Sequence, residues 1–264
     1  MDLKLKNKVV LLAAATDGLG LATAKQLLQE GAIVALCGRD LNRNRTAEKT
    51  LIAMSNENQV FVYPCDVTDK IQVESFVTAV ATKFNRIDVV ITNAGGPPAG
   101  TFETLDIDAY EKGFKLNLMS AVYLIKACLP HLKKSDCPSI LTITSRSAKA
   151  PIPNLFISNV IRPGIIGFTK ALSLELAEYG IRVNSILPGW TKTERTVYLL
   201  EKRAEKAGIS YEECESNLIK TLPLKRMGDP QEFANAATFL VSSAASYITG
   251  VMLLVDGGDY QGLG

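Results

Sequence analysis

The sequence predicts an α/β fold in which a single doubly wound domain is built on a mostly or wholly parallel, seven-stranded sheet. Short runs of apolar, β-branched residues recur along the chain, and segments with the apolar spacing of helices lie between them. Strands that alternate with helices in this way form βαβ units and a parallel sheet. No low-complexity or Ser/Gly-rich linker divides the 264 residues, so residues 1–264 are expected to form one domain.

Seven runs are predicted to be the strands of this sheet. The first run is apolar throughout, which is typical of a strand that is buried on both faces of a parallel sheet. Segments with helical spacing separate most of the runs from one another. In chain order the predicted strands are Val9–Ala14, Ile33–Cys37, Val60–Cys65, Val89–Thr92, Ile140–Thr144, Val183–Leu187 and Val251–Val255.

The helical patterns between the strands carry recognisable start and stop signals. Apolar residues with helical spacing occur in Leu19–Leu27, Val73–Val80 and Leu172–Leu176. Gly31 is placed to end the first of these helices. Residues Asp229–Glu232 offer an N-cap, a proline at the first helical position and a capping glutamate, so another helix is expected to begin there.

The connection that begins at Trp190 is longer than the others. It carries two helical patterns, Val197–Ala207 and Tyr211–Lys220. Long segments after the carboxyl end of a parallel strand lie where substrates bind in open α/β sheets. Residues at about 190–227 are therefore predicted to form a substrate-covering insertion. Its first apolar side chains either line a substrate pocket or cover the core or an oligomer face: Trp190, Tyr198, Leu199 and Leu200.

Composition excludes several classes of function. Lys and Arg number 29 and Asp and Glu number 27, so the net charge of +2 gives no reason to expect nucleic acid or an acidic membrane as a partner. The only histidine, His131, lies near a predicted helix end, and no metal site is expected. Five unpaired cysteines without a C-x-x-C motif, a charged Met1–Lys8 segment and no bilayer-length apolar run predict a soluble, cytoplasmic protein.

The turn after the first predicted strand has the character of a phosphate-binding loop. Gly18 and Gly20 lie in it, just ahead of a helix. Glycines allow a dinucleotide to approach the backbone, and the first turn of the helix presents free N–H groups to its phosphates. A plain tight turn is the alternative interpretation. The residues predicted to contact the cofactor here are Ala14, Thr16, Asp17, Gly18, Leu19 and Gly20.

Further motifs follow the later strands in a fixed order. They are Asp66-Val67, Asn93-Ala94-Gly95, the helical Asn117, Pro188-Gly189 with Thr191, and Val255-Asp256-Gly257-Gly258. With these motifs the chain resembles the short-chain dehydrogenase/reductase family over almost its whole length. The resemblance implies a Rossmann fold and a nicotinamide cofactor bound by these residues. It also implies hydride transfer between that cofactor and a carbonyl or alcohol substrate, in a homotetramer or homodimer whose interfaces involve helices near Asp108–His131 and Gly164–Tyr179.

Two departures from the family pattern concern the cofactor. Ala13 and Ala14 stand where the family has Thr and Gly; an alanine fits there if its φ is negative, but its methyl group could crowd the cofactor. The second predicted strand ends without the carboxylate that would bind the ribose of NAD, and Arg39 follows. An arginine suits a 2′-phosphate, so NADP(H) is favoured over NAD(H). Asp17 argues mildly against this choice, and Asp40 could instead pair with Arg39.

The largest departure is catalytic. The family uses a Ser that binds the substrate oxygen, a Tyr that delivers the proton, and a Lys that lowers the pKa of that Tyr. Ser145 matches the Ser, but Ser158 and Arg162 occupy the positions of the Tyr and the Lys. Arg162 keeps a positive charge but does not release a proton near neutral pH. Pro163 predicts that the helix here starts later than in the family or bends.

Three interpretations of this site remain open. The favoured one is an oxidoreductase with a different proton donor, either a water held by Ser145 and Asn117, or Lys149, or Tyr198. The second is a nucleotide-binding sensor or partner protein that barely turns over. In the third, the fold serves only as a unit of a larger assembly. The stretches 95–100 and 151–159 resemble a divergent subset of the family, similar to 3-oxoacyl-acyl-carrier-protein reductases but with an incomplete catalytic tetrad.

Overall fold

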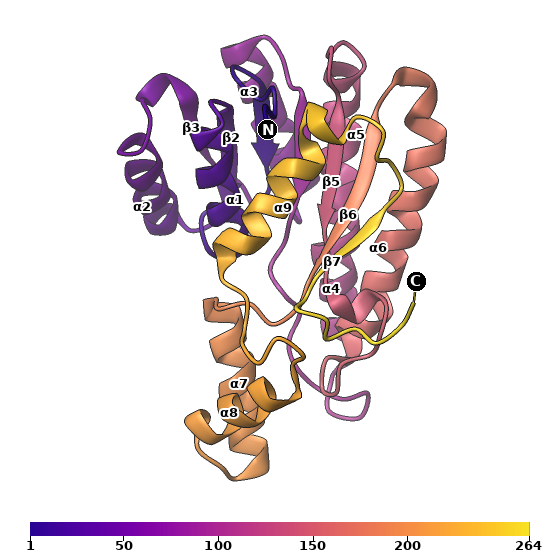
Figure 1. Cartoon of the computed structure of the whole chain (residues 1–264). Coiled ribbons are helices and arrows are strands. Elements are labelled where there is room, and N and C mark those ends of the chain that lie inside the picture. Colours follow the sequence, from indigo (N-terminus) through magenta and orange to yellow (C-terminus); the bar gives the residue numbers. More distant parts are fainter. Residues whose placement is uncertain (264) are drawn as a thin grey trace.

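A computed structural model describes residues 1–263 and contains one sheet whose neighbouring strands are all parallel (Figure 1). The strand order within the described residues is β3-β2-β1-β4-β5-β6-β7. The predicted doubly wound, seven-stranded parallel sheet is therefore confirmed. Its strands are β1 (Val9–Leu12), β2 (Ile33–Gly38), β3 (Val60–Pro64), β4 (Val89–Thr92), β5 (Ser139–Ile143), β6 (Arg182–Pro188) and β7 (Met252–Val255).

Helices cover both faces of the sheet (Figure 1). Along β1, Val10 and Leu12 pack under α1, α2 and α9, whereas Val9 and Leu11 pack under α3 and α5 on the other face. This alternation between two cores explains why β1 is apolar throughout. The helices are α1 (Gly18–Gln29), α2 (Leu41–Ile52), α3 (Lys70–Phe84), α4 (Ile107–Phe114), α5 (Ser120–Leu132), α6 (Phe156–Glu175), α7 (Glu194–Ala207), α8 (Tyr211–Thr221) and α9 (Pro230–Val241).

Several local expectations are confirmed. The carboxylate of Glu232 accepts a hydrogen bond of 2.8 Å from the backbone N–H of Asp229, which caps α9. His131 lies in the last turn of α5, where burial lowers its pKa. All five cysteines are free. A π-helical turn, Lys115–Met119, joins α4 to α5.

The predicted insertion forms α7 and α8, which lie beyond the carboxyl ends of the strands (Figure 1). The two helices pack together through Leu200, Ala204 and Cys214. In residues 1–263, none of the helices combines the length and the apolar character that crossing a membrane requires.

The expectation that Pro163 delays or bends its helix is wrong. α6 begins at Phe156 and continues as one helix through Pro163 to Glu175. Pro163 lies on the exposed face of α6, where water can bond to the carbonyl group that loses its N–H donor. On the opposite face Ile157, Ile161 and Ile165 are buried in one apolar cluster, and this packing stabilises the helix against the local effect of proline.

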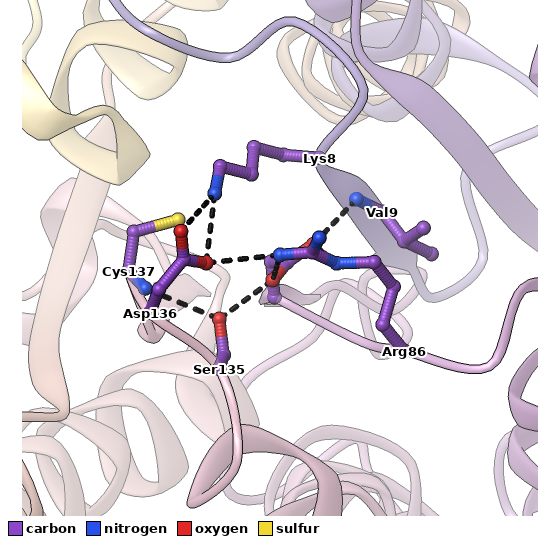
Figure 2. Close-up of polar contacts among 7 residues, drawn as sticks. Lys8, Val9, Arg86, Ser135, Asp136 and Cys137 are labelled. Atoms are coloured by element: carbon purple, nitrogen blue, oxygen red, sulfur yellow. Dashed lines mark hydrogen bonds and ion pairs between the residues drawn. The ribbon is translucent and has the colours of Figure 1, made fainter.

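A group of charges connects strands at the amino edge of the sheet (Figure 2). We call it the Asp88 cluster; its members are Lys8, Arg86, Asp88, Ser135 and Asp136. The fully buried Asp88 carboxylate accepts four hydrogen bonds, from the Val9 N–H (2.8 Å), from Nε and Nη2 of Arg86 (2.8 and 2.6 Å) and from Ser135 Oγ (2.6 Å). It joins β1, β4 and the segment that precedes β5.

The Asp88 cluster also brings together three potential metal ligands. Asp88, Asp136 and the Cys137 thiol have ligand atoms within 4.8 Å of one another. Both carboxylates already bind cations of the chain, because Arg86 contacts both of them and Lys8 contacts Asp136 at 2.7 Å. We assign no metal to this group.

Candidate active site

A cleft of about 630 Å³ opens at the carboxyl ends of β1, β4, β5 and β6, on the side of α7. It lies at the point where the strand order reverses between β1 and β4, which is where ligands bind in sheets of this kind. Most of the site residues predicted from the sequence line this cleft. They are Ala14, Thr16, Asp17, Gly18, Leu19, Gly20, Arg39, Asn93, Ala94, Gly95, Ser145, Ser158, Arg162, Pro188, Gly189 and Thr191.

Asp66, Val67 and Asn117 were predicted with them but lie outside the lining of the cleft. The Asp66 carboxylate accepts hydrogen bonds from the N–H and the hydroxyl of Thr68, at 2.9 and 2.8 Å, and Val67 is buried. Asn117 is buried behind the cleft, and its Nδ2 donates a hydrogen bond of 2.9 Å to the carbonyl of Gly95. In this structure Asn117 therefore fixes a wall of the cleft.

The turn between β1 and α1 needs its glycines. Gly18 has a φ of 52°, and a Cβ at Gly20 would lie 2.7 Å from the Cα of Ala15. Asp17 caps α1 by accepting a hydrogen bond from the Gly18 N–H. The amino end of α1 thus lies on the cleft, with the positive end of its dipole in place for an anion such as a pyrophosphate.

Ala14 does not meet the condition under which an alanine fits this turn. Its φ is +44°, in the left-handed region that costs a residue with a Cβ roughly 1–2 kcal/mol. Its carbonyl accepts a hydrogen bond of 2.8 Å from Nδ2 of Asn93, at the end of β4. This contact holds the strained turn in place.

The end of β2 carries no acidic side chain of the kind that binds NAD. A Cβ at Gly38 would lie 2.6 Å from Oδ1 of Asn44 and 2.8 Å from Oγ1 of Thr16. Asp40 accepts hydrogen bonds from the N–H groups of Asn42 and Arg43, at 2.8 and 3.0 Å, and so caps α2 instead of pairing with Arg39. Arg39 is exposed on the cleft and forms no ion pair within residues 1–263.

Sequence reasoning missed a second arginine at this end of the cleft. Arg43 bonds to Asp17 in the turn and to Glu194 at the start of α7, where its Nη2 lies 2.9 Å from the carboxylate. These exposed pairs span the cleft and contribute little stability. The sequence signal that indicates Arg43 is its position in the first turn of α2, four residues after Arg39.

At the other end of the cleft, the three residues predicted to occupy the catalytic positions lie together. Ser145 follows β5, and its Oγ accepts a hydrogen bond of 3.1 Å from the Ser147 N–H. Ser158 and Arg162 are one turn apart in α6; both are buried and both line the cleft. Within residues 1–263 the Ser158 hydroxyl forms no hydrogen bond.

Arg162 is a buried cation with few partners. Its side chain is 6% exposed, its Nη1 donates one hydrogen bond of 3.3 Å to the Ile143 carbonyl, and its Nε has no partner among the described residues. Burial, together with the nearby charge of Arg195, lowers the pKa of Arg162 to about 10. It therefore remains charged at neutral pH. Arg195 itself lines the cleft and bonds to the Pro97 carbonyl at 2.6 Å; it too was not predicted.

Some of the candidate proton donors and pocket residues line the cleft, and others do not. Lys149 and Tyr198 do not line the cleft: Lys149 Nζ lies 5.5 Å from the centre of the Tyr260 ring, and Tyr198 lies under Arg195. Trp190 and Leu199 do line the cleft, whereas Leu200 is buried between α7 and α8. Only Ser145, of the groups proposed to hold a catalytic water, faces the cleft.

A glycine turn and a basic cleft at the switch point of a parallel sheet define a dinucleotide-binding α/β protein. A family model described as enoyl-(acyl carrier protein) reductase matches residues 13–259. The chain is also 33% identical to dehydrogenase/reductase SDR family member 4 of Oryctolagus cuniculus, over 96% of this chain and 94% of the relative. The chain belongs to the short-chain dehydrogenase/reductase family.

Two solved structures show how closely the fold is shared. L-sorbose reductase from Gluconobacter frateurii, complexed with NADPH and L-sorbose, superposes with a TM-score of 0.93 at 27% identity, over 100% of both chains. An NADPH-bound short-chain oxidoreductase from Pseudomonas aeruginosa PAO1 gives a TM-score of 0.88 at 29% identity, over 97% of this chain and 99% of that one. The second protein is described as containing an atypical catalytic center.

Proposed function

We propose that the chain is an NADP(H)-dependent oxidoreductase that interconverts a carbonyl compound and its alcohol, with Arg162 as the charge that stabilises the substrate oxygen. The observation that carries this proposal is the buried, poorly partnered guanidinium of Arg162 beside Ser145 and Ser158 in the cleft. A buried cation without partners is costly, and an enzyme that develops negative charge at this point gives a reason to keep it.

The preference for NADP(H) is supported by the shape and charge of the cleft near α2. β2 ends at Gly38 without an acidic side chain, Asp40 is used as a helix cap, and Arg39 forms no ion pair among residues 1–263. A free guanidinium forms a charge-assisted fork with a 2′-phosphate. Residues 14–20 would hold the pyrophosphate of the cofactor, and residues 93–95 and 188–191 would line the cleft around its nicotinamide end.

The chain's own residues then divide the chemistry. When bound, NADPH supplies a hydride to the carbonyl carbon, so that one carbonyl compound, one NADPH and one proton give one alcohol and one NADP⁺. Ser145 and Ser158 donate hydrogen bonds to the substrate oxygen, and Arg162 stabilises its developing negative charge. Because Arg162 stays protonated at neutral pH, the proton comes from water, passed on through a serine hydroxyl. The insertion of α7 and α8 covers the substrate.

We also propose that the protein is a homotetramer or homodimer through α4, α5 and α6. Large apolar side chains are exposed on two of these helices, Ile107 and Phe114 on α4 and Val160 and Leu174 on α6. An interface would remove these side chains from water.

Cofactor titration followed by a turnover assay tests the proposed function. The wild type should bind NADPH more tightly than NADH, and it should reduce at least one compound in a panel of ketones and aldehydes. Arg39→Gln should weaken NADPH binding by about 10- to 100-fold, the value of one charge-assisted hydrogen bond, and leave NADH binding unchanged. NADPH binding without turnover would favour the sensor or partner role instead. Binding of neither cofactor would overturn both.

A double variant tests the catalytic assignment. Ser158→Tyr with Arg162→Lys restores the family's acid and its charged neighbour on an unbroken helix, one turn apart. If the native site lacks only a phenolic proton donor, the double variant should reduce the same substrate faster. Arg162→Lys alone is the matched control, and it should be slower than the wild type because a lysine presents a different geometry to the oxygen.

A further inference from the structure

A second cavity lies next to the cleft. It has a volume of about 230 Å³ and lies between α7 and two segments, 99–104 ahead of α4 and 153–155 ahead of α6. Leu155, Trp190 and Leu199 line both this cavity and the cleft, so the two spaces adjoin each other at these three side chains. A ligand that extends from Ser145 past these side chains along α7 would enter this cavity.

The wall of this cavity is apolar but positively charged at one side. Lys202, Arg203 and Lys206 line it from α7, and no Asp or Glu is among its lining residues. Two of the three cations have partners. Lys202 pairs with Glu205 at 2.7 Å, and Lys206 donates a hydrogen bond of 2.8 Å to Oδ1 of Asn154.

Arg203 is the cation without a polar partner. It is half-buried, and within residues 1–263 it forms neither a hydrogen bond nor an ion pair. Its guanidinium carbon lies 4.5 Å from the centre of the Trp190 ring, and burial lowers its pKa. The guanidinium of Arg203, with its five N–H donors, thus lies over an aromatic wall and has no hydrogen-bond acceptor among residues 1–263.

We propose that this cavity binds the anionic end of the substrate, an amphipathic carbonyl compound that carries a carboxylate or phosphate group. Arg203 forms a forked, charge-assisted pair with the oxyanion. The apolar part of the substrate lies against Leu155, Trp190 and Leu199. This inference rests on the proposed function, since it places the substrate carbonyl at Ser145 and Arg162.

The test uses a signal that does not depend on turnover. Trp190 is the only tryptophan in the chain and lines both the cavity and the cleft, so its fluorescence reports ligand binding where the two adjoin, and the Arg203 variants assign the signal to the cavity. The protein with bound NADPH is titrated with linear oxo acids, from levulinate to longer chains, and with the methyl ester of each acid. Dihydroxyacetone phosphate and dihydroxyacetone form the phosphate arm. At least one anionic ligand should bind about 10- to 100-fold more tightly than its neutral counterpart.

Three variants show where that preference arises. Arg203→Met keeps an apolar cover on Trp190 and should abolish the preference while the neutral ligands still bind. Arg203→Lys keeps the charge and should retain part of the preference. Lys220→Gln removes one positive charge from the exposed surface of α8, outside both cavities, and should leave the preference intact.

The outcomes separate this inference from the proposed function. Equal binding of charged and neutral ligands by the wild type would overturn the anion site, even if neutral ketones are reduced. A preference that Lys220→Gln abolishes as strongly as Arg203→Met would also overturn it. A preference lost only with Arg203, in a protein that reduces no carbonyl compound, would support the anion site and overturn the proposed function.

Discussion

Asp88 and Arg162 are two buried charged residues at opposite ends of the strands. Asp88 lies at the amino ends of the strands, and Arg162 lies near their carboxyl ends. Asp88 is fully buried and accepts four hydrogen bonds of 2.6–2.8 Å, two of them from the guanidinium of Arg86. Arg162 is 6% exposed and donates a single hydrogen bond of 3.3 Å. The first charge is satisfied within the chain and holds the fold together. The second is left with unused donors, which is a cost to stability that a ligand can repay.

Removing the satisfied charge should have the largest effect on stability. Asp88→Ala leaves the Val9 N–H and the Nε of Arg86 without their acceptor, so the free energy of unfolding should fall by about 3–5 kcal/mol. Urea denaturation measures this loss. Asp136→Asn is the matched control within the Asp88 cluster; Asp136 is 71% exposed, and its loss should cost no more than about 1 kcal/mol. Equal losses in the two variants would contradict the comparison.

Replacing Arg162, whose charge has few partners, should instead raise the free energy of unfolding. Burial lowers the pKa of Arg162 below its value in the unfolded chain, so the charge of Arg162 reduces the free energy of unfolding, and this reduction is complete at every pH below about 10. Arg162→Met should therefore unfold at higher urea concentration, with a gain of about 1–2 kcal/mol. Its reductase activity should fall by about 10²- to 10³-fold, as for the loss of one oxyanion donor. A destabilised variant would contradict the comparison.

The pH dependence of the wild-type reduction rate gives a further test of the role of Arg162. If reduction needs the charge of Arg162, the rate should fall as the pH rises above about 10, where the guanidinium loses its proton. The residual activity of Arg162→Met should not share that fall. If the reduction rate of Arg162→Met falls in the same way as that of the wild type above a pH of about 10, the fall is caused by the titration of another group.

The smallest change in the free energy of unfolding is expected from a substitution in the turn between β1 and α1. Ala14→Gly removes the Cβ that a φ of +44° disfavours, so the free energy of unfolding should rise by about 0.5–1 kcal/mol. NADPH should also bind more tightly if the methyl group crowds it. Ala13→Gly is the control: Ala13 is buried and has no positive φ, so the same change should destabilise the fold. Thermal unfolding of both variants with and without NADPH checks the pair.

The fold and the outline of the cleft were predictable because their signals are local. The seven strands were readable from apolar runs, and Gly18 and Gly20 from their place between a strand and a helix. The effect of Pro163 was mispredicted for the same reason. The rule that proline disrupts a helix is local, whereas Ile157, Ile161 and Ile165 hold α6 together through packing against other elements.

The partners of the charged side chains were not predictable. Arg43 binds Glu194, which lies 151 residues further along the chain, and the Val9 N–H binds Asp88 across 79 residues. An acidic residue close by in the sequence does not decide the pairing: Asp88 lies two residues after Arg86 and binds it, whereas Glu205 lies two residues after Arg203 and does not. Arg43 and Arg86 are paired within the chain, and Arg39, Arg162 and Arg203 form no ion pair among residues 1–263.

The sequence alone determined the parallel sheet, the glycine turn and the two helices after Trp190, and it predicted that Ser158 and Arg162 stand where the family has Tyr and Lys. Each of these depends on residue type and on spacing along the chain. Only the tertiary structure decided which cations are satisfied and which face the cleft with free donors. The physical reason is that the free energy of a buried charge depends on the groups within a few ångströms of it, and folding brings those groups together from distant parts of the chain.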